Sequence, residues 1–145
     1  MLLDHTRPGI PLYANPDLFR GRYEQRSGHP RDIGIEWTRE ELAARVTIHL
    51  NSKPTEIASG VLTTGEITDR NESQGSGAHL VMQKSGVLVA DEYVDDMSVV
   101  LQEAGRSTLL CGCCHAGLLN TLAHVERTFH LPVDRTVVMG SRIEL

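Results

Sequence analysis

The stretch STLLCGCCHAGLLNTLAHVE, residues 107–126, indicates how the chain folds and where its chemistry lies. Residues 107–112 form a continuous apolar run, which predicts a buried strand that leads through a short turn into a helix. The helix is expected to end near His130, because Pro132 follows two residues later. Its apolar side chains recur on one helical face, at Leu118, Leu122, Val125 and Phe129. A further strand is predicted at 135–140, which gives a βαβ-like ending.

The chain before this stretch is rich in strand patterns. Short β-branched or alternating segments, separated by turn residues, predict strands at 10–14, 46–50, 55–58, 60–67, 79–83, 86–90 and 98–103. Together with the strand, turn and helix around residue 115, these segments predict an α/β fold in which a β-rich meander precedes the helix.

Two helix starts and two loops complete the predicted elements. Thr38 followed by Glu41 is a capping-box pattern, which predicts a helix over 39–45. Asn15 before Pro16 predicts a short capped helix after the first strand. Two stretches rich in breaker residues, or without a stable period, are predicted to be loops, at 24–36 and 69–77.

Length, charge and cysteine usage limit the class of protein. The 145 residues suit one domain, 1–145, and 40% hydrophobic with 23% charged residues is close to the average of soluble globular proteins. A net charge of -5 without a run of Lys or Arg argues against a nucleic-acid partner. No run approaches the ~20 apolar residues that span a bilayer, so no membrane association is predicted. The odd number of cysteines and the absence of a basic, apolar start favour a cytoplasmic, reducing location.

His115 is the first candidate for chemistry, because it lies in the turn between a strand and a helix. Ligands gather at that end of a strand in α/β proteins, and the positive end of a helix disfavours the imidazolium form. A neutral imidazole has a lone pair to give to a metal ion. A simple hydrogen bond from the ring to nearby backbone is the alternative interpretation.

The cysteines at positions 111, 113 and 114 allow further interpretations. A Cys-x-Cys-Cys-His cluster has zinc-binding side chains, but structural zinc sites usually take a second pair of ligands from another segment. Cys113 and Cys114 are adjacent, which leaves a redox role open, although no Cys-x-x-Cys motif is present. Cys111 and Cys113 are otherwise interpreted as small buried hydrophobic residues.

An ordered set of segments resembles one family. GCCHAGLLNTLAHV, residues 112–125, resembles the GC-x-HAG turn of metallo-β-lactamase-fold hydrolases. The resemblance is greatest to the 7,8-dihydropterin-6-methyl-4-(ribofuranosyl)aminobenzene phosphate synthase-like branch. Four further segments are similar to that branch in the same order, at 10–23, 31–42, 57–67 and 94–117.

The resemblance implies an αββα sandwich with two divalent metal ions, zinc or another, at one edge of the sheets. Asp4 and His5 match the D-H end of the family's H-x-H-x-D-H motif and would bind the second metal, with Asp4 also the candidate catalytic residue. His115 matches the turn histidine and would bind the first. Leu2 and Arg142 stand where the family has histidines, and arginine has no free lone pair. The expected fold is therefore a partial sandwich, truncated at the N-terminus and lacking the leading strands.

Three functions remain open at this point. The resemblance implies a metal-dependent hydrolase of a small phosphate ester, phosphodiester or related small-molecule substrate, acting through a metal-bound hydroxide and impaired here by its incomplete ligand set. The alternative, which that incomplete set favours, is a non-catalytic remnant. A third is a zinc- or thiol-binding module of Cys113, Cys114 and His115. A homodimer is also expected, because missing strands would leave an open sheet edge.

Other polar residues have simpler expected roles. Asp95 and Asp96 resemble an acidic pair in the family, although a charged turn explains them equally well. Trp37 is interpreted as a packing anchor before the helix at 39–45. The remaining histidines have no partner motif and are expected in loops or at the surface, at His29, His49, His79, His124 and His130.

Overall fold

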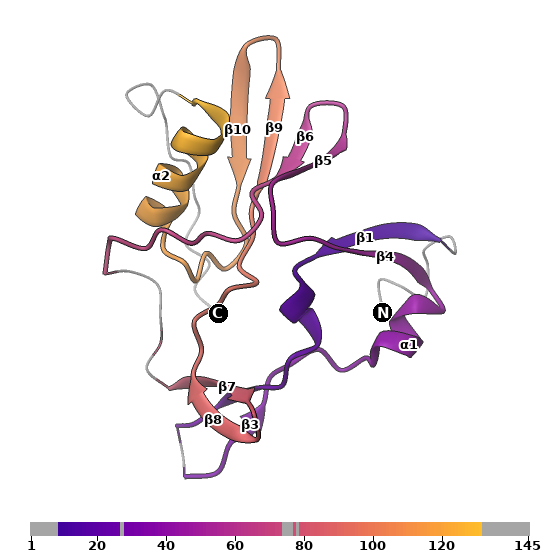
Figure 1. Ribbon diagram of the computed structural model, residues 1–145, viewed down its shortest axis with the longest axis vertical. Helices are drawn as coiled ribbons and strands as arrows, with labels where there is room; N and C mark the ends of the chain where they lie inside the picture. Colours follow the sequence, from indigo (N-terminus) through magenta and orange to yellow (C-terminus); the bar gives the residue numbers. More distant parts are fainter. Residues whose placement is uncertain (1–8, 27, 74–76, 78, 132–145) are drawn as a thin grey trace, which may run out of the picture.

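The computed structural model describes residues 9–26, 28–73, 77 and 79–131, and these form a mixed α/β fold with three small sheets (Figure 1). The two-stranded sheet pairs β1 (Ile10–Ala14) with β4 (Val46–Leu50) in parallel. One four-stranded sheet has the order β10-β9-β6-β5, with strands Arg106–Leu110, Val99–Glu103, Val61–Thr63 and Thr55–Ala58. The other has the order β3-β2-β7-β8, with strands Arg31–Asp32, Arg22–Glu24, Leu80–Lys84 and Val87–Ala90.

Two hairpins form because their turn residues accept left-handed backbone conformations. Ser85 and Gly86 join β7 to β8 with φ of 51° and 83°, and Ala104 and Gly105 join β9 to β10 with φ of 49° and 74°. Positive φ at both central residues matches the right-handed twist of antiparallel strands. The strands predicted at 79–83, 86–90 and 98–103 are confirmed by β7, β8 and β9 to within one residue at each end.

The connection between β1 and β4 contains both predicted helix starts. Asn15 caps the 3-10 helix η2 (Pro16–Phe19) by accepting a hydrogen bond from the Asp17 N–H at 2.9 Å. The predicted helix at 39–45 is confirmed as α1 (Arg39–Ala43), and both halves of its capping box are formed by Thr38 and Glu41. The short strands β2 and β3 occupy part of 24–36, so the prediction of a loop there is only partly right.

The strand predicted at 60–67 ends early, at Thr63. Gly65 has φ of 65°, and a Cβ atom at this position would lie 2.5 Å from the backbone carbon of Lys53 and 2.8 Å from the Ser52 carbonyl oxygen. The chain therefore stops pairing with β9 after Thr63 and passes close to the residues just before β5. Residues 69–73 have no regular structure, in agreement with the predicted loop.

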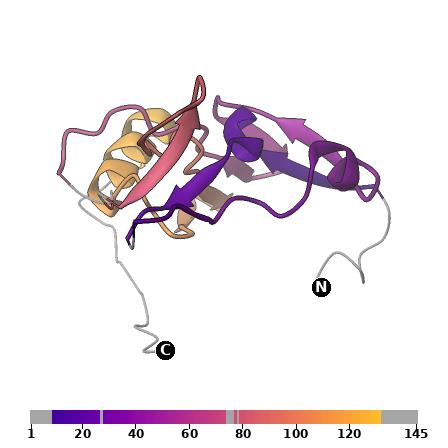
Figure 2. The same cartoon turned by 90° about the horizontal axis from the view of Figure 1, so that it is seen from below.

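Helix α2 (Leu118–Phe129) lies beside the β10-β9-β6-β5 sheet (Figures 1 and 2). The apolar face predicted for it is partly wrong: Leu118 is 37% exposed, whereas the polar residues Asn120 and Thr121 are almost fully buried. The side chains of these two residues bond to backbone carbonyls of their own turn, which makes their burial possible. Val125 is buried as predicted, and His130 ends the helix in a left-handed conformation.

The prediction of a buried strand at 107–112 is wrong. Among the described strands, β10 lies at the edge of its sheet; it is mostly exposed and pairs with β9 as an antiparallel hairpin. The strand predicted at 135–140 lies outside the described residues.

The buried apolar residues are mainly aliphatic and are spread over the three sheets and α2. They are Ala14, Leu42, Val46, Ile67, Val81, Met82, Tyr93, Val100, Ala116 and Val125. Tyr93 is thus a buried aromatic ring outside any strand or helix. None of the helices within the described residues has the length and apolar composition to cross a membrane.

Candidate functional site

His115 lies in the tight turn that joins β10 to α2. Cys114, directly before it, has φ of 55°, and Gly117, directly after Ala116, has φ of 90°. The Gly117 N–H donates to the Cys114 carbonyl oxygen at 2.9 Å, which closes the turn. Gly117 is also the N-cap of α2, so the imidazole is placed at the start of a helix of 12 residues, as the sequence predicted.

The ring of His115 stacks on the ring of Tyr93. Their centroids are 4.2 Å apart and their planes differ by 4°. The His115 side chain is half-buried, and neither of its ring nitrogens has a hydrogen-bond partner among the described residues. Within the described part of the chain, the ring is therefore held by its face, through the stack on Tyr93.

Tyr93 is itself fixed by its backbone. Its N–H donates to Asp91 Oδ1 at 2.8 Å, and its carbonyl oxygen accepts from Arg70 Nη2 at 2.7 Å and from the Asp96 N–H at 3.1 Å. These bonds hold the residue at φ of 49°, a conformation that is costly for a bulky side chain. Strain of this kind concentrates at functional sites.

The hydroxyl of Tyr93 is buried without a hydrogen-bond partner in the described part of the chain, and the residue is only 6% exposed. Burial raises the pKa of Tyr93 above its ordinary value of 10.0, and the negative charge of Asp91 raises it further. The phenol is therefore neutral at physiological pH. An unpartnered buried hydroxyl is uncommon in a folded protein, because it loses its bonds to water without replacement.

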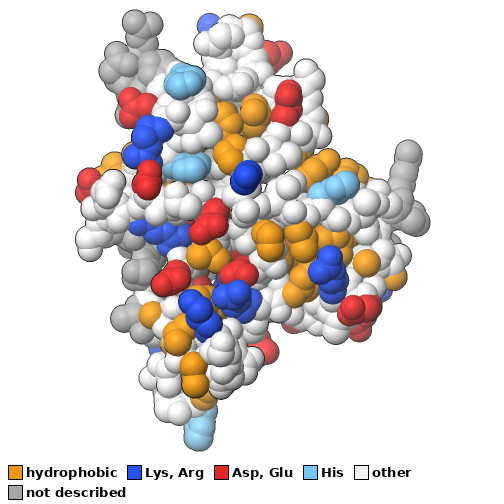
Figure 3. All heavy atoms as spheres, in the orientation of Figure 1, with side chains coloured by type: hydrophobic (Ala, Val, Ile, Leu, Met, Phe, Trp, Pro, Cys, Tyr) orange, Lys and Arg blue, Asp and Glu red, His pale blue; other side chains and the backbone are white. Residues whose placement is uncertain are grey.

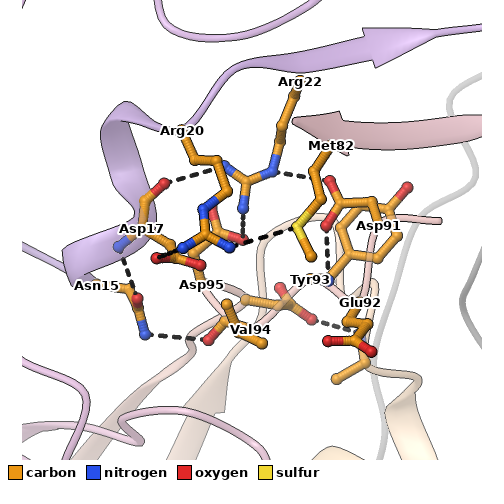
Figure 4. A network of polar contacts seen from close by, with 12 residues as sticks. Asn15, Asp17, Arg20, Arg22, Met82, Asp91, Glu92, Tyr93, Val94 and Asp95 are labelled. Atoms are coloured by element: carbon orange, nitrogen blue, oxygen red, sulfur yellow. Dashed lines mark hydrogen bonds and ion pairs between the residues drawn. The ribbon is translucent and has the colours of Figure 1, made fainter. Parts of the chain in front are cut away.

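Arg22 holds the segment 91–96 at both of its ends (Figure 4). Its Nε donates to Asp91 Oδ2 at 2.8 Å and its Nη2 donates to Asp95 Oδ1 at 2.6 Å. Only 12% of the Arg22 side chain and 2% of the Asp91 side chain are exposed. Burial raises the pKa of Asp95, and this effect outweighs the opposing attraction of Arg22.

Two more side chains bind the carbonyl groups of the same segment. Arg70 donates to the carbonyl oxygens of Glu92 and Tyr93, and Asn15 Nδ2 donates to the Val94 carbonyl oxygen at 3.0 Å. Since each of these side chains comes from a different part of the chain, the segment 91–96 is fixed from several directions. It is a rigid support for the ring of Tyr93.

Asp96 ties this support to the histidine turn. Its Oδ2 accepts the Ala116 N–H at 2.6 Å, directly beside His115. Asn120 fixes the far side of the turn, donating from Nδ2 to the carbonyl oxygens of Ala116 at 2.8 Å and Glu72 at 2.9 Å. The acidic pair noted in the sequence is thus divided: Asp95 pairs with Arg22, and Asp96 bonds to the turn.

The three cysteines differ in exposure, and the thiols of Cys111 and Cys114 interact. Cys111 and Cys113 are exposed, which corrects their interpretation as small buried residues. Cys114 is half-buried, its Sγ lies 3.5 Å from Thr121 Oγ1, and burial raises its pKa. A thiol with a raised pKa is a poor nucleophile and a poor metal ligand. Although Cys111, Cys113, Cys114 and His115 are all described, they form no group that could hold a metal ion.

The other predicted residues fall into two sets. Asp4 and His5, with Leu2 and Arg142, lie outside the described residues, so their placement relative to His115 stays a prediction. Three of the remaining histidines have other contacts: His124 Nε2 donates to the Thr64 carbonyl oxygen at 3.0 Å, His79 Nε2 accepts from Arg26, and His49 stacks on Tyr13. His29 and His130 are exposed, as expected. Trp37 contacts Arg45, whose guanidinium carbon lies 4.4 Å from the centre of the ring.

The described residues fit one ligand of a metal centre. His115 has the chemistry and the free ring edge for it, but within the described part of the chain no group of three or more His, Cys, Asp or Glu side chains could hold an ion. A complete centre would need further donors, and the resemblance names Asp4 and His5 for that role.

Two hollows on the surface lie around Trp37 rather than His115. One, of about 390 Å³, is lined by residues 19–21, 32 and 34–39, and the other, of about 220 Å³, by Glu36, Trp37, Glu41 and Arg45. Neither is lined by His115 or Tyr93, and both are open to solvent. On the face drawn in Figure 3, acidic and basic side chains are interspersed rather than gathered by sign.

Comparison with known proteins connects this architecture to one fold. No family model and no curated protein matches the chain. Among solved structures, the chain is similar to the crystal structure of Tm1679, a metal-dependent hydrolase of the β-lactamase superfamily, with a TM-score of 0.72 and 19% sequence identity. The match covers 88% of this chain and 46% of that one, so the chain spans less than half the length of this neighbour. The likeness shows that the chain shares the fold of that superfamily.

Proposed function

We propose that this chain is a metal-dependent hydrolase of the metallo-β-lactamase superfamily, in which His115 is a metal ligand. The observation that supports this most directly is the imidazole that stacks at 4.2 Å on a buried tyrosine while its nitrogens lack partners among the described residues. A histidine whose only task is structural normally hydrogen-bonds through its ring. The shared fold with a metal-dependent hydrolase supports the same assignment.

We further propose Asp4 and His5 as the partner ligands, Asp4 as the catalytic residue, and zinc or another divalent ion as the cofactor. When bound, such an ion supplies a Lewis acid and a water of lowered pKa. The substrate class that we propose is a small phosphate ester or phosphodiester. The chain's own described residues would orient the site: Tyr93 holds His115 by its face, and Asp96 holds the turn.

The test is Zn²⁺ binding by calorimetry, with metal content measured after purification without chelator. We expect the wild-type chain to bind Zn²⁺ and His115→Ala to bind it at least about tenfold more weakly, because the variant loses an imidazole ligand. His49→Ala is the matched control, since His49 also stacks on a tyrosine and is exposed. It should bind like the wild type.

Two outcomes would contradict the proposal. Absence of Zn²⁺ binding by the wild type would favour the non-catalytic alternative, and equal losses in His115→Ala and His49→Ala would indicate non-specific binding. Asp4→Ala and His5→Ala test the remaining ligands in the same assay. Hydrolysis of bis(p-nitrophenyl) phosphate by the Zn²⁺-loaded chain, absent in His115→Ala, tests the substrate class.

A further inference from the structure

We propose that Tyr93 is the positioning residue of this site, and that its ring sets the orientation in which His115 presents its nitrogens. The metal-binding part of this inference rests on the proposed function, whereas the orienting part rests on the ring stack alone. Two rings within 4° of parallel leave the imidazole little freedom to rotate out of plane. A ligand nitrogen has to point at its ion with correct direction, so the ring that fixes this direction acts on the site through His115.

The support behind the ring explains why Tyr93, rather than His115, determines the orientation. His115 has no ring hydrogen bond among the described residues, whereas Tyr93 is held by Asp91, Arg70 and Asp96 through its backbone. The tyrosine is 6% exposed and strained at φ of 49°, whereas the histidine is half-buried. Because Tyr93 is fixed more firmly than His115, the plane of the tyrosine ring sets the plane of the imidazole.

A second stacked pair in the chain provides a comparison. Tyr13 and His49 lie on neighbouring strands β1 and β4, with centroids 4.8 Å apart and planes that differ by 16°. His49 is exposed, and the pair arises from simple register across the strands. The Tyr93 stack is closer and more nearly parallel, although its two residues lie in separate loops and no sheet register aligns them. Its alignment therefore depends on the network around the segment 91–96.

The Tyr93 side chain could act on His115 through its ring or through its hydroxyl, and the structure separates these two roles. The hydroxyl bonds to no group among the described residues, so it has no part in holding His115. If the ring alone positions the imidazole, Tyr93→Phe should keep the function and Tyr93→Leu should lose it. Leucine fills much of the same space but has no flat face.

The experiment compares Tyr93→Phe, Tyr93→Leu and Tyr13→Leu with the wild type by NMR and by Zn²⁺ titration. In wild type and Tyr93→Phe, we expect the carbon-bound ring protons of His115 to show the upfield shift caused by an aromatic ring facing them. Tyr93→Leu should lose this shift, and its His115 side-chain couplings should average over rotamers. Its Zn²⁺ affinity should fall about tenfold, whereas Tyr13→Leu should change only the signals of His49.

Each outcome bears on the proposal. A Tyr93→Leu chain that keeps one His115 rotamer, or that loses the rotamer but keeps wild-type Zn²⁺ affinity, would overturn it. So would an equal loss of affinity in Tyr13→Leu, because general destabilisation would then explain both. If the wild type binds no Zn²⁺, the proposed function fails, but the His115 shifts and couplings still decide whether Tyr93 orients the ring.

Discussion

At the scale of single residues, the site depends on contacts that sequence patterns do not carry. The place of His115 in the turn between a strand and a helix was predictable, because an apolar run precedes it and a helical pattern follows it. Tyr93 was not, since a tyrosine between acidic residues gives no local sign that it will be buried. Arg22 lies 69 residues before its partner Asp91, and only the folded chain brings the two together. Long-range pairs of this kind have no periodicity to detect.

Tyr93→Phe is expected to raise the free energy of unfolding by about 1 kcal/mol, because the wild type buries a hydroxyl without a partner. Urea unfolding at neutral pH measures the change. Tyr13→Phe is the control and should stay within about 0.5 kcal/mol of the wild type, as expected for a side chain outside such a site. A loss of stability in Tyr93→Phe would show that the hydroxyl makes a favourable interaction.

At the scale of elements, the predicted helices and strands match the structure where the residue periodicity and the capping or turn residues at the ends agreed. The strands at 10–14, 46–50 and 55–58 match the structure at both ends, and Thr38 with Glu41 correctly starts α1. Prediction failed for β10, because an apolar run indicates a strand but not whether the strand is central or at an edge. It also failed for the face of α2, where the buried polar residue Asn120 bonds to backbone that no periodicity reveals.

The capping box of α1 predicts a dependence on pH. Hydrogen bonds from the Thr38 N–H and hydroxyl lower the pKa of Glu41 from its ordinary value of 4.5. Because the folded pKa is the lower one, the carboxylate's contribution to stability is complete above about pH 4.5 and is lost as the pH falls through the lowered pKa. An NMR titration of the Glu41 carboxyl carbon should give a midpoint below 4.5.

Thr38→Ala checks the cause of that shift. The variant loses the hydroxyl, so the Glu41 midpoint should move toward the ordinary value, and the free energy of unfolding should fall by about 1 kcal/mol. Thr47→Ala is the control, because Thr47 is exposed on β4 and belongs to no helix cap. An unchanged Glu41 midpoint in Thr38→Ala would mean that the side-chain bond contributes little.

At the scale of the whole molecule, the buried apolar residues are spread over three small sheets and α2, and two of the described edge strands expose apolar side chains. No described strand pairs with the outer side of β8, where Val87 is 60% and Leu88 38% exposed. Leu110 on β10 is 51% exposed as well. An exposed apolar edge strand can pair with a second chain.

We therefore expect concentration-dependent self-association through β8, measured by sedimentation equilibrium. Val87→Lys should weaken the dimer about tenfold, because one valine side chain loses ~1.5 kcal/mol of burial and a charge is placed at the edge. Ala44→Lys, at an exposed position after α1, is the matched control and should associate like the wild type. A monomeric wild type at every concentration would contradict the expectation.

The segment 91–96 has a consequence for biosynthesis. Arg22 leaves the ribosome 69 residues before Asp91, and Asn15 leaves it 79 residues before Val94. At translation rates of about 5–20 residues per second, Arg22 waits roughly 3 to 14 seconds for its first carboxylate partner. A nascent chain that is arrested before residue 91 therefore carries Arg22 and Asn15 without their partners in the segment 91–96, and the histidine turn is completed only after most of the polypeptide has been made.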